Sequence, residues 1–571
     1  MREIGTRPAC CVPMTANLAT STMYSAARES DPLLPSYAPA PEISQHNHHH
    51  HSQEINYGTY IDPTSTGGTP APEQWNNRHD FPKNRGLEAG EDEEEPSRTV
   101  ENTMARVFRG LFTIIFFGLV VAFVVSFLNT RDREDDPPWD DQDPHQEPQP
   151  ERTIEERASA VLSSTPLIDG HNDLAIFIRS EYKNNITNAR FAREFEKGGM
   201  PLHVDLPRLR SGKVGGAFWS AFVLCPANAS YDMTDSNYAT AVSHTTEQID
   251  LLRRLQEEYS SDFITTSNKV FGKESEEMLL KWRSSSRRPM FGQLSIEGLH
   301  QVPPTAPMST LRHYYDLGVR MATLTWNCHN PFADASLVWN DFSAPMKVVN
   351  GVFRPKEGAV THRGRQVLQE MNRLGMIIDI SHTSYWTQKA VLSEDEHGKR
   401  ITRAPVVFSH SSAYSICPHP RNVRDDILDL VPASNSLVMV NFSPDFVSCV
   451  PASGEGIDAS EPHFSLPEFF EKNNTLHQVA RHITYMGQRI GYDYVGLGSD
   501  FDGMGEPPKG LEGVDKFPDL VAELLRMGVS DEDAGKVVGG NLLRVWRDAE
   551  VVSAKMKDEG IEPGLDDASG Y

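Results

Sequence analysis

Two residues with metal-binding side chains lie close together near the start of a long C-terminal region. The segment LIDGHNDL (167–174) is a short apolar run followed by a polar tip that carries His171 and Asp173. In an extended strand, residues i and i+2 project from the same face, so this imidazole and this carboxylate converge on one point. Zinc is bound by such nitrogen and oxygen ligands. A single His-x-Asp pair also fits a hydrogen-bonded loop, so the prediction of a metal site depends on further ligands.

Four more chemically competent residues follow later apolar runs of the sequence. Glu297 follows QLSI, His382 follows IIDIS, His410 follows VVFS and Asp500 follows VGLGS. Each one alone is typical of a packed or capping residue. Together they indicate a cluster, because the carboxyl ends of the strands in a parallel barrel face one active site. The sequence contains no phosphate-binding glycine loop and no Gly-x-Ser-x-Gly nucleophile motif that would favour another chemistry.

The number of candidate ligands predicts two metal ions. A catalytic zinc takes three protein ligands and a water, and the sequence offers three histidines, one aspartate and one glutamate. We expect His171, Asp173 and one oxygen of Glu297 at the first ion, and the other oxygen of Glu297 with His382 and His410 at the second. Two ions about 3.5–4 Å apart can hold a hydroxide that attacks a carbonyl at neutral pH. Asp500 is then placed to carry a proton to the leaving amine.

The elements that must position these residues are predicted between residues 153 and 549. Stretches such as 246–259 and 363–374 have the amphipathic pattern of helices and separate the apolar runs. Strands that alternate with helices indicate a parallel sheet, and eight of them favour an α/β fold of the (β/α)8 TIM-barrel type, with an open doubly wound sheet as the alternative. The expected strands are 166–168, 217–224, 290–296, 320–325, 376–380, 405–408, 436–441 and 494–498.

The motifs of this region resemble those of a known family. IDGHNDL, SIEG, IIDISH, VVFSHSSAYSICPHPRNV, GLGSDFDG and GGNLLRVW are similar to the motifs of the renal-type membrane dipeptidases, across residues 153–549. The resemblance implies a binuclear zinc peptidase with a (β/α)8 barrel that cleaves dipeptides and, in some members, β-lactams. It implies the five zinc ligands named above, with Glu297 bridging two Zn²⁺ ions, and Asp500 as the catalytic aspartate that also contacts substrate.

The same resemblance assigns three further features. Arg421 corresponds to the arginine that receives the carboxylate of the substrate, a role that suits the bidentate guanidinium group. Four cysteines fall at family positions, which implies the disulfides Cys225–Cys328 and Cys417–Cys449.

One position departs from the family pattern. A histidine is usual after the fourth strand, where this sequence has Trp326, with His329 three residues later. Both are candidate substrate-binding residues. The Trp326 N–H could replace the histidine as a donor, His329 could enter the site from the same loop, or activity on ordinary dipeptides could be weak. We expect hydrolysis to persist with an altered substrate preference. For His329, the alternative is a loop residue bonded to backbone.

The N-terminal part of the chain has a different composition. Residues 1–105 are rich in polar residues and proline and are predicted to be a disordered cytosolic region. Segment 106–128 contains an uncharged run, 110–128, long enough for one transmembrane helix. A proline- and acid-rich stalk (129–152) connects it to the barrel, and 550–571 form a tail without a hydrophobic lipid-anchor signal.

The orientation across the membrane is predicted from features that follow the span. Asn185, Asn228 and Asn473 begin glycosylation sequons, and the four family cysteines are able to pair in an oxidising compartment. These features favour a single-pass membrane glycoprotein with its N-terminus in the cytosol and its catalytic domain in a lumen or outside the cell.

The expected partners are a dipeptide substrate and the membrane, and a homodimer is left open. Nucleic acid is excluded because the formal net charge is -25 and no basic face is evident. Two alternative functions stay open beside a zinc dipeptidase. They are a related amide or β-lactam hydrolase, and a binding module that retains metal but is catalytically weak.

Overall fold

The computed structural model describes residues 151–265, 273–339, 344–451 and 465–566. The predicted disordered region, membrane span and nearly all of the stalk lie outside these residues and stay predictions. Among the described residues, no helix has both the length and the apolar character needed to cross a bilayer.

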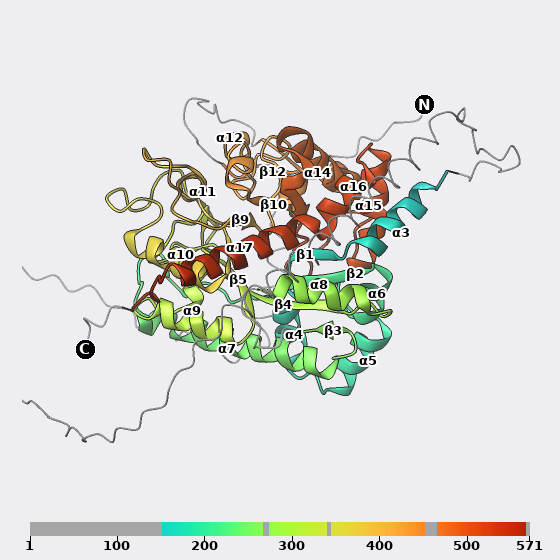
Figure 1. The fold of residues 1–571 in the computed structure, drawn as a ribbon, viewed down its shortest axis with the longest axis horizontal. Helices are drawn as coiled ribbons and strands as arrows, with labels where there is room; N and C mark the ends of the chain where they lie inside the picture. The colour runs from blue at the N-terminus through green and yellow to red at the C-terminus, as the bar shows by residue number, and fades with distance from the viewer. Residues whose placement is uncertain (1–150, 266–272, 340–343, 452–464, 567–571) are drawn as a thin grey trace, which may run out of the picture. The chain divides into compact units, whose positions relative to one another are not determined.

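Eight parallel strands form a nearly closed α/β barrel (Figure 1). Their order in the sheet is β1-β2-β4-β5-β8-β9-β10-β13. The strands are β1 (Leu167–Asn172), β2 (Val214–Ala221), β4 (Met290–Glu297), β5 (Val319–Thr323), β8 (Ile377–Asp379), β9 (Val406–Phe408), β10 (Leu437–Val440) and β13 (Val495–Leu497). All eight predicted strands are therefore present, although β2 begins three residues earlier than expected and ends at Ala221. Both faces of these strands are buried, as expected for a parallel sheet covered by helices.

The barrel closes between its first and last strands through a few backbone contacts. The Asp500 N–H donates to the His171 carbonyl at 3.1 Å, and the Asp173 N–H donates to the Phe501 carbonyl at 2.9 Å. Asn172 and Phe501 form an isolated parallel bridge. These contacts lie at the carboxyl ends of β1 and β13, so barrel closure also brings Asp500 beside the His171–Asp173 pair.

Helices surround the strands, and both amphipathic helices expected from the sequence are present. The helices are α3 (Ile154–Ser164), α4 (Leu174–Tyr182), α5 (Ala189–Lys197), α6 (Leu206–Ser211), α7 (Asp235–Glu258), α8 (Glu274–Ser284), α9 (Pro307–Asp316), α10 (His362–Leu374), α11 (Tyr385–Leu392), α12 (Asp425–Leu428), α13 (Pro444–Val447), α14 (Leu476–Ile490), α15 (Phe517–Arg526), α16 (Asp531–Gly535) and α17 (Asn541–Asp558). The ends of helix α10 are set by local sequence signals. The Thr361 hydroxyl caps its first turn by accepting from the Gly364 N–H, and Gly375 ends it in the left-handed conformation.

Helix α17 packs against the interior of the barrel near the ends at which the strands begin. It runs across the strands in Figure 1, and its Trp546 ring meets the Phe218 ring of β2 edge to face at 6.1 Å. Leu542 and Val545 of the same helix join a buried cluster with Ile168 and Ile377. Because these apolar contacts fill that region, the polar residues of the barrel interior gather at the opposite, carboxyl end.

Short strands outside the barrel were not predicted. Strand β3 (Phe263–Ile264) pairs with β4, and two antiparallel pairs, β6 (Leu337–Val338) with β7 (Lys347–Val348) and β11 (Cys449–Val450) with β12 (Glu468–Phe469), lie in the connections.

Candidate metal centre

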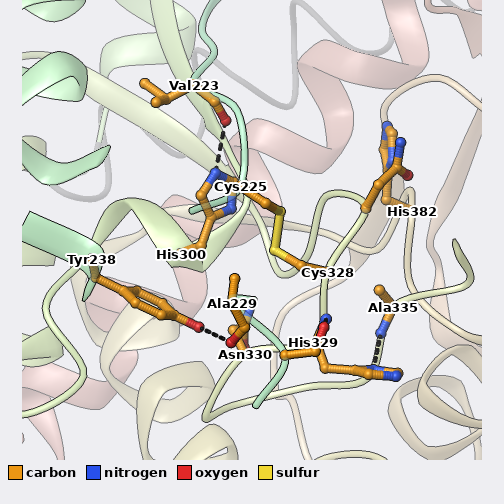
Figure 2. Close-up of a disulfide and its surroundings, with 12 residues drawn as sticks. Val223, Cys225, Ala229, Tyr238, His300, Cys328, His329, Asn330, Ala335 and His382 are labelled. Atoms are coloured by element: carbon orange, nitrogen blue, oxygen red, sulfur yellow. Dashed lines mark hydrogen bonds between the residues drawn. A yellow bond between two sulfur atoms is a disulfide. The ribbon is translucent and has the colours of Figure 1, made fainter. Parts of the chain in front are cut away.

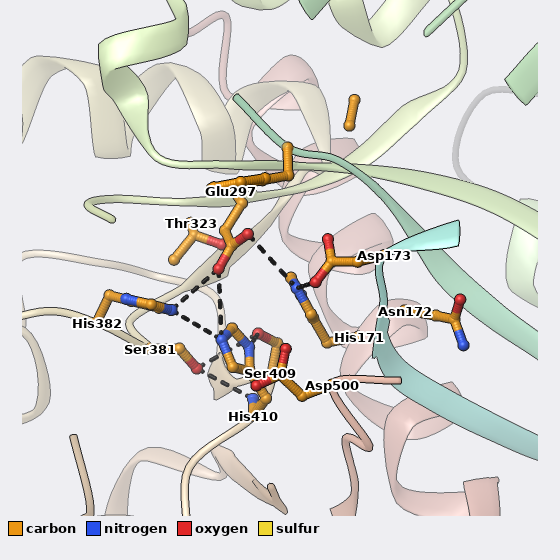
Figure 3. A network of polar contacts seen from close by, with 12 residues as sticks. His171, Asn172, Asp173, Glu297, Thr323, Ser381, His382, Ser409, His410 and Asp500 are labelled. Carbon is orange, nitrogen blue, oxygen red and sulfur yellow. Dashed lines mark hydrogen bonds and ion pairs between the residues drawn. The ribbon is translucent and has the colours of Figure 1, made fainter. Parts of the chain in front are cut away.

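The five predicted metal ligands come together at the carboxyl ends of the strands (Figure 3). His171 is the last residue but one of β1, Asp173 follows that strand directly, and Glu297 is the last residue of β4. His382 lies three residues beyond β8, and His410 lies two residues beyond β9. All five residues are at most 6% exposed, so the cluster is shielded from water.

The two oxygens of Glu297 face two different groups of ligands. Its Oε2 is 3.6 Å from His171 Nε2, which is itself 3.2 Å from Asp173 Oδ2. Its Oε1 is 3.0 Å from His382 Nε2 and 3.5 Å from His410 Nε2. Figure 3 shows the carboxylate between the two groups, and each group contains three metal-competent atoms within 4.8 Å of one another.

The donor atoms fit two metal ions. The Nε2 atoms of His382 and His410 lie 2.9 Å apart, and Asp173 Oδ1 is buried without a hydrogen-bond partner. Burial lowers the pKa of both histidines well below the usual range, which keeps the imidazoles neutral, as ligands must be. Burial also raises the pKa of the Glu297 carboxyl to about 7. A cation in each group would satisfy these buried atoms, and the nitrogen and oxygen donor set suits zinc.

Hydrogen bonds at the Nδ1 atoms of His382 and His410 orient both rings so that their Nε2 atoms face the cluster. The Ser409 hydroxyl donates to Asp379 Oδ2 at 2.6 Å, so the His410 Nδ1–H donates to the Ser409 oxygen at 2.7 Å. The His382 Nδ1 pairs with Asn327 Oδ1 at 3.1 Å, and since that oxygen only accepts, Nδ1 carries the proton. Both Nε2 atoms therefore present a lone pair to the metal site.

Two buried aspartates brace the strands that carry the ligands. Asp379 accepts from the Ser409 N–H at 2.9 Å and from its hydroxyl at 2.6 Å, which joins β8 to β9. Asp169 accepts from the Ser499 N–H at 2.7 Å and from its hydroxyl at 2.5 Å, which joins β1 to the end of β13. Burial raises the pKa of Asp169 to about 6. Sequence reasoning missed these positioning residues, although each brace serine directly precedes a predicted site residue.

Asp500 lies beside the cluster, in one group with His171 and His410. Its Oδ2 accepts from Asn441 Nδ2 at 3.0 Å, and removal of the carboxyl from water raises its pKa to about 6. Its φ of 65° is a backbone conformation that residues other than glycine seldom adopt, and such strain concentrates at functional sites. A carboxyl with a pKa near neutrality is suited to accept and return a proton.

Arg421 is buried on the His410 side of the cluster. Its side chain is 2% exposed, and its Nε has no hydrogen-bond partner. The other hydrogen bonds of the guanidinium are long, 3.5 Å to Ser411 Oγ and 3.4 Å to the His410 carbonyl, and the group lies over the Phe446 ring at 5.2 Å from its centroid. Burial lowers its pKa to about 10, and no carboxylate among the described residues lies within ion-pair distance of it. The group is therefore able to receive an anion.

Trp326 and His329 occupy different environments in the loop that follows β5. The Trp326 ring lies 6.3 Å from the His382 ring, next to the metal site. In Figure 2 the His329 ring extends toward Ala335, where its Nδ1 accepts from the Ala335 N–H at 3.1 Å. Its ring also stacks on Phe353 at 4.1 Å. These contacts favour the interpretation of His329 as a residue that braces the loop.

Both expected disulfides are present. Cys225–Cys328 joins the segment after β2 to the segment after β5 (Figure 2), and Cys417–Cys449 joins the segments after β9 and β10. His300 lies close to Cys225 and Cys328, but those sulfurs are bonded to each other and offer no thiolate to a metal.

Buried histidines and carboxylates gathered at the carboxyl end of a barrel are typical of metal-dependent enzymes. The sequence profile of the membrane dipeptidases (peptidase family M19) matches residues 155–560. The chain is 42% identical to dipeptidase aclJ of Aspergillus oryzae over 398 residues, 70% of this chain and 81% of that protein. It is 38% identical to dipeptidase verJ of Clonostachys rogersoniana over 412 residues, 71% of this chain and 90% of that protein. The chain therefore belongs to peptidase family M19, and it is a metal-dependent dipeptide hydrolase.

Solved structures agree with the fold. The probable dipeptidase PvdM from Pseudomonas aeruginosa has a TM-score of 0.54 at 20% identity, over 70% of this chain and 99% of that one. A metallopeptidase from Rhodobacter sphaeroides, solved with a phosphinate mimic of a dipeptide, has a TM-score of 0.51 at 21% identity, over 67% and 99% of the two chains.

Proposed function

We propose that this chain is a binuclear zinc dipeptidase in which Glu297 bridges the two ions. The observation that carries the proposal is the position of the Glu297 carboxylate, whose two oxygens face two separate sets of buried ligands. Two zinc ions would polarise the peptide carbonyl and lower the pKa of a bound water to about 7.

Asp500 is proposed as the group that moves the proton. Peptide hydrolysis needs a base that accepts a proton from the attacking water and an acid that protonates the leaving nitrogen. Asp500 is grouped with one residue from each ligand set, His171 and His410, so it can serve both steps at one place. Its pKa of about 6 keeps both protonation states accessible.

Arg421 is proposed to bind the carboxylate of the dipeptide. A guanidinium and a carboxylate form two parallel charge-assisted hydrogen bonds, and the Arg421 Nε is buried without another partner. A fixed clamp close to His410 selects dipeptides, because a longer peptide carries its terminal carboxylate beyond reach of the clamp.

Attachment to a membrane is a separate proposal. The uncharged segment 110–128 would anchor the chain with the barrel in a lumen or outside the cell. The asparagines of the three sequons are all exposed, which supports their glycosylation in that compartment: Asn185, Asn228 and Asn473. Digestion of intact vesicles by protease, with and without detergent, tests the topology. Protection of the barrel only in the absence of detergent is expected, and digestion in both conditions would contradict it.

Hydrolysis by the metal-loaded full chain tests the enzymatic proposal. We expect cleavage of several dipeptides, no cleavage of the matching tripeptides, loss of activity with a chelator and recovery with zinc. The Asp500→Asn variant serves as a control that retains the ligands but lacks the proton carrier. Cleavage of β-lactams or peptide conjugates without cleavage of dipeptides would favour a related amide hydrolase. Zinc binding without cleavage of any of them would favour a weak or inactive binding module.

A further inference from the structure

Three aromatic side chains lie together beside the metal centre. The Trp326 ring contacts the Phe222 ring edge to face at 4.9 Å and lies 6.5 Å from the Trp339 ring. Phe222 and Trp339 are partly exposed, whereas Trp326 is 6% exposed. We call these three residues the aromatic wall. Because Trp326 also lies 6.3 Å from the His382 ring, the wall borders one of the two ligand sets.

The wall is held rigidly by bonds on both sides. The Cys225–Cys328 disulfide connects the segment that carries Phe222 to the segment that carries Trp326. The Trp339 N–H donates to the Asn327 carbonyl at 2.8 Å, and its indole N–H donates to Ala344 at 2.9 Å. The side chain of Asn327 in turn holds His382. The wall is therefore fixed relative to the metal ligands, as a specificity surface must be.

The barrel topology places the Phe222 end of the wall across from the proposed carboxylate clamp. Phe222 follows β2 and Trp326 follows β5, the second and fourth strands in the order of the sheet. Arg421 follows β9 and Asp500 follows β13, the sixth and eighth strands. In a ring of eight, the second strand lies across from the sixth and the fourth from the eighth, so Phe222 faces the strand of Arg421 and Trp326 faces the strand of Asp500. A dipeptide spans about 7 Å when extended, so a molecule with its carboxylate on Arg421 directs its N-terminal residue toward the wall.

We propose that the aromatic wall receives the side chain of the N-terminal residue of the substrate and selects large apolar or aromatic side chains there. This inference rests on the proposed dipeptidase function and adds the substrate class. The three rings offer apolar surface, and removal of a phenyl or isobutyl group from water against them favours binding. Aromatic pairs add to this when rings meet edge to face. A charged side chain is disfavoured against the wall because it would lose its hydration without a partner.

Specificity constants for matched dipeptides test the proposal in the full, zinc-loaded chain. Phe-Gly and Leu-Gly should exceed Gly-Gly by about tenfold or more, whereas Gly-Phe should not show that gain. Trp326→Ala should reduce the preference for Phe-Gly over Gly-Gly to within about threefold, and Trp326→Phe should retain it. Tyr231→Ala is the matched control, because this aromatic residue is 68% exposed and its ring contacts Phe353, which is not part of the wall.

The ratio of two substrates separates specificity from a general loss of folding, which would lower both rates together. An unchanged Phe-Gly to Gly-Gly ratio in Trp326→Ala, or a parent enzyme without that preference, would overturn the proposal while leaving dipeptidase activity intact.

Binding of phosphinate dipeptide mimics, measured by calorimetry, separates this inference from the proposed function. Tighter binding of the mimic with an N-terminal phenylalanine side chain than of the glycine mimic, without any turnover, would support the wall and contradict the activity. Absence of both binding and turnover would overturn both.

Discussion

Replacement of Arg421 by methionine should have opposite effects on substrate binding and on stability. The guanidinium is buried, its Nε has no partner, and its contacts with Ser411 and the His410 carbonyl are 3.4 Å or longer. Burial also lowers its pKa to about 10, which indicates a cation that the free protein solvates incompletely. A side chain in this condition is better explained by a ligand than by the stability of the fold.

The magnitudes follow from these contacts. Loss of a bidentate, charge-assisted pair with the substrate carboxylate should cost about 3 kcal/mol, or about 150-fold in kcat/KM. Replacement of a poorly paired buried ion by an apolar side chain of similar length is often neutral or stabilising by about 1–4 kcal/mol. We therefore expect the Arg421→Met variant to bind dipeptides poorly and to melt at the same temperature as the parent or higher.

The assay compares Phe-Gly with Phe-Gly amide, which lacks the carboxylate, and records the melting temperature of each variant. Arg421→Met should lose activity on the acid and change little on the amide. Arg403→Met, which removes a half-exposed arginine paired with Glu559, is the control. A variant that melts well below the parent and keeps the acid-to-amide ratio of the parent would refute the reasoning, because Arg421 would then be structural.

Three other substitutions test the site. Asp500→Asn should retain fold and metals while kcat falls by about 10²–10⁴-fold, as measured by steady-state kinetics; normal turnover would exclude it as the proton carrier. Ser409→Ala removes the acceptor of the His410 Nδ1–H, so zinc affinity should fall by about 10–100-fold in competition with a chelator; unchanged affinity would contradict that orienting role. Trp326→His should raise kcat/KM for small dipeptides such as Gly-Gly by at least about tenfold, or 1.4 kcal/mol. If the variant shows no gain and the parent enzyme already cleaves these dipeptides fast, this position does not limit catalysis.

The barrel strands and the metal ligands could be predicted from sequence because both are local signals. A fully buried parallel strand is a short apolar run, and the ligand follows it within a few residues, as in IIDISH for His382. The periodicity of helices such as α10 is equally local. Once the runs were recognised as parallel strands, their common carboxyl end placed the ligands together.

The braces and the aromatic wall could not be predicted because they depend on pairs distant in sequence. Asp169 and Ser499 are 330 residues apart, and the hydrogen bonds between them follow only from the closure of the barrel. Phe222 meets Trp326 only after β2 and β5 are set on either side of β4. The two-residue strands, such as β3, are too short to give a periodic pattern.

Zinc stoichiometry and position, measured by elemental analysis and anomalous diffraction on the parent and on Glu297→Gln, test the central claim most directly. We expect about two zinc ions per parent chain, one on each side of the Glu297 carboxylate, since its two oxygens face separate ligand sets. The glutamine variant should lose occupancy at both positions, because it replaces the shared carboxylate by a neutral group. A single ion in the parent, or two fully occupied positions and normal turnover in the variant, would contradict the bridged binuclear centre.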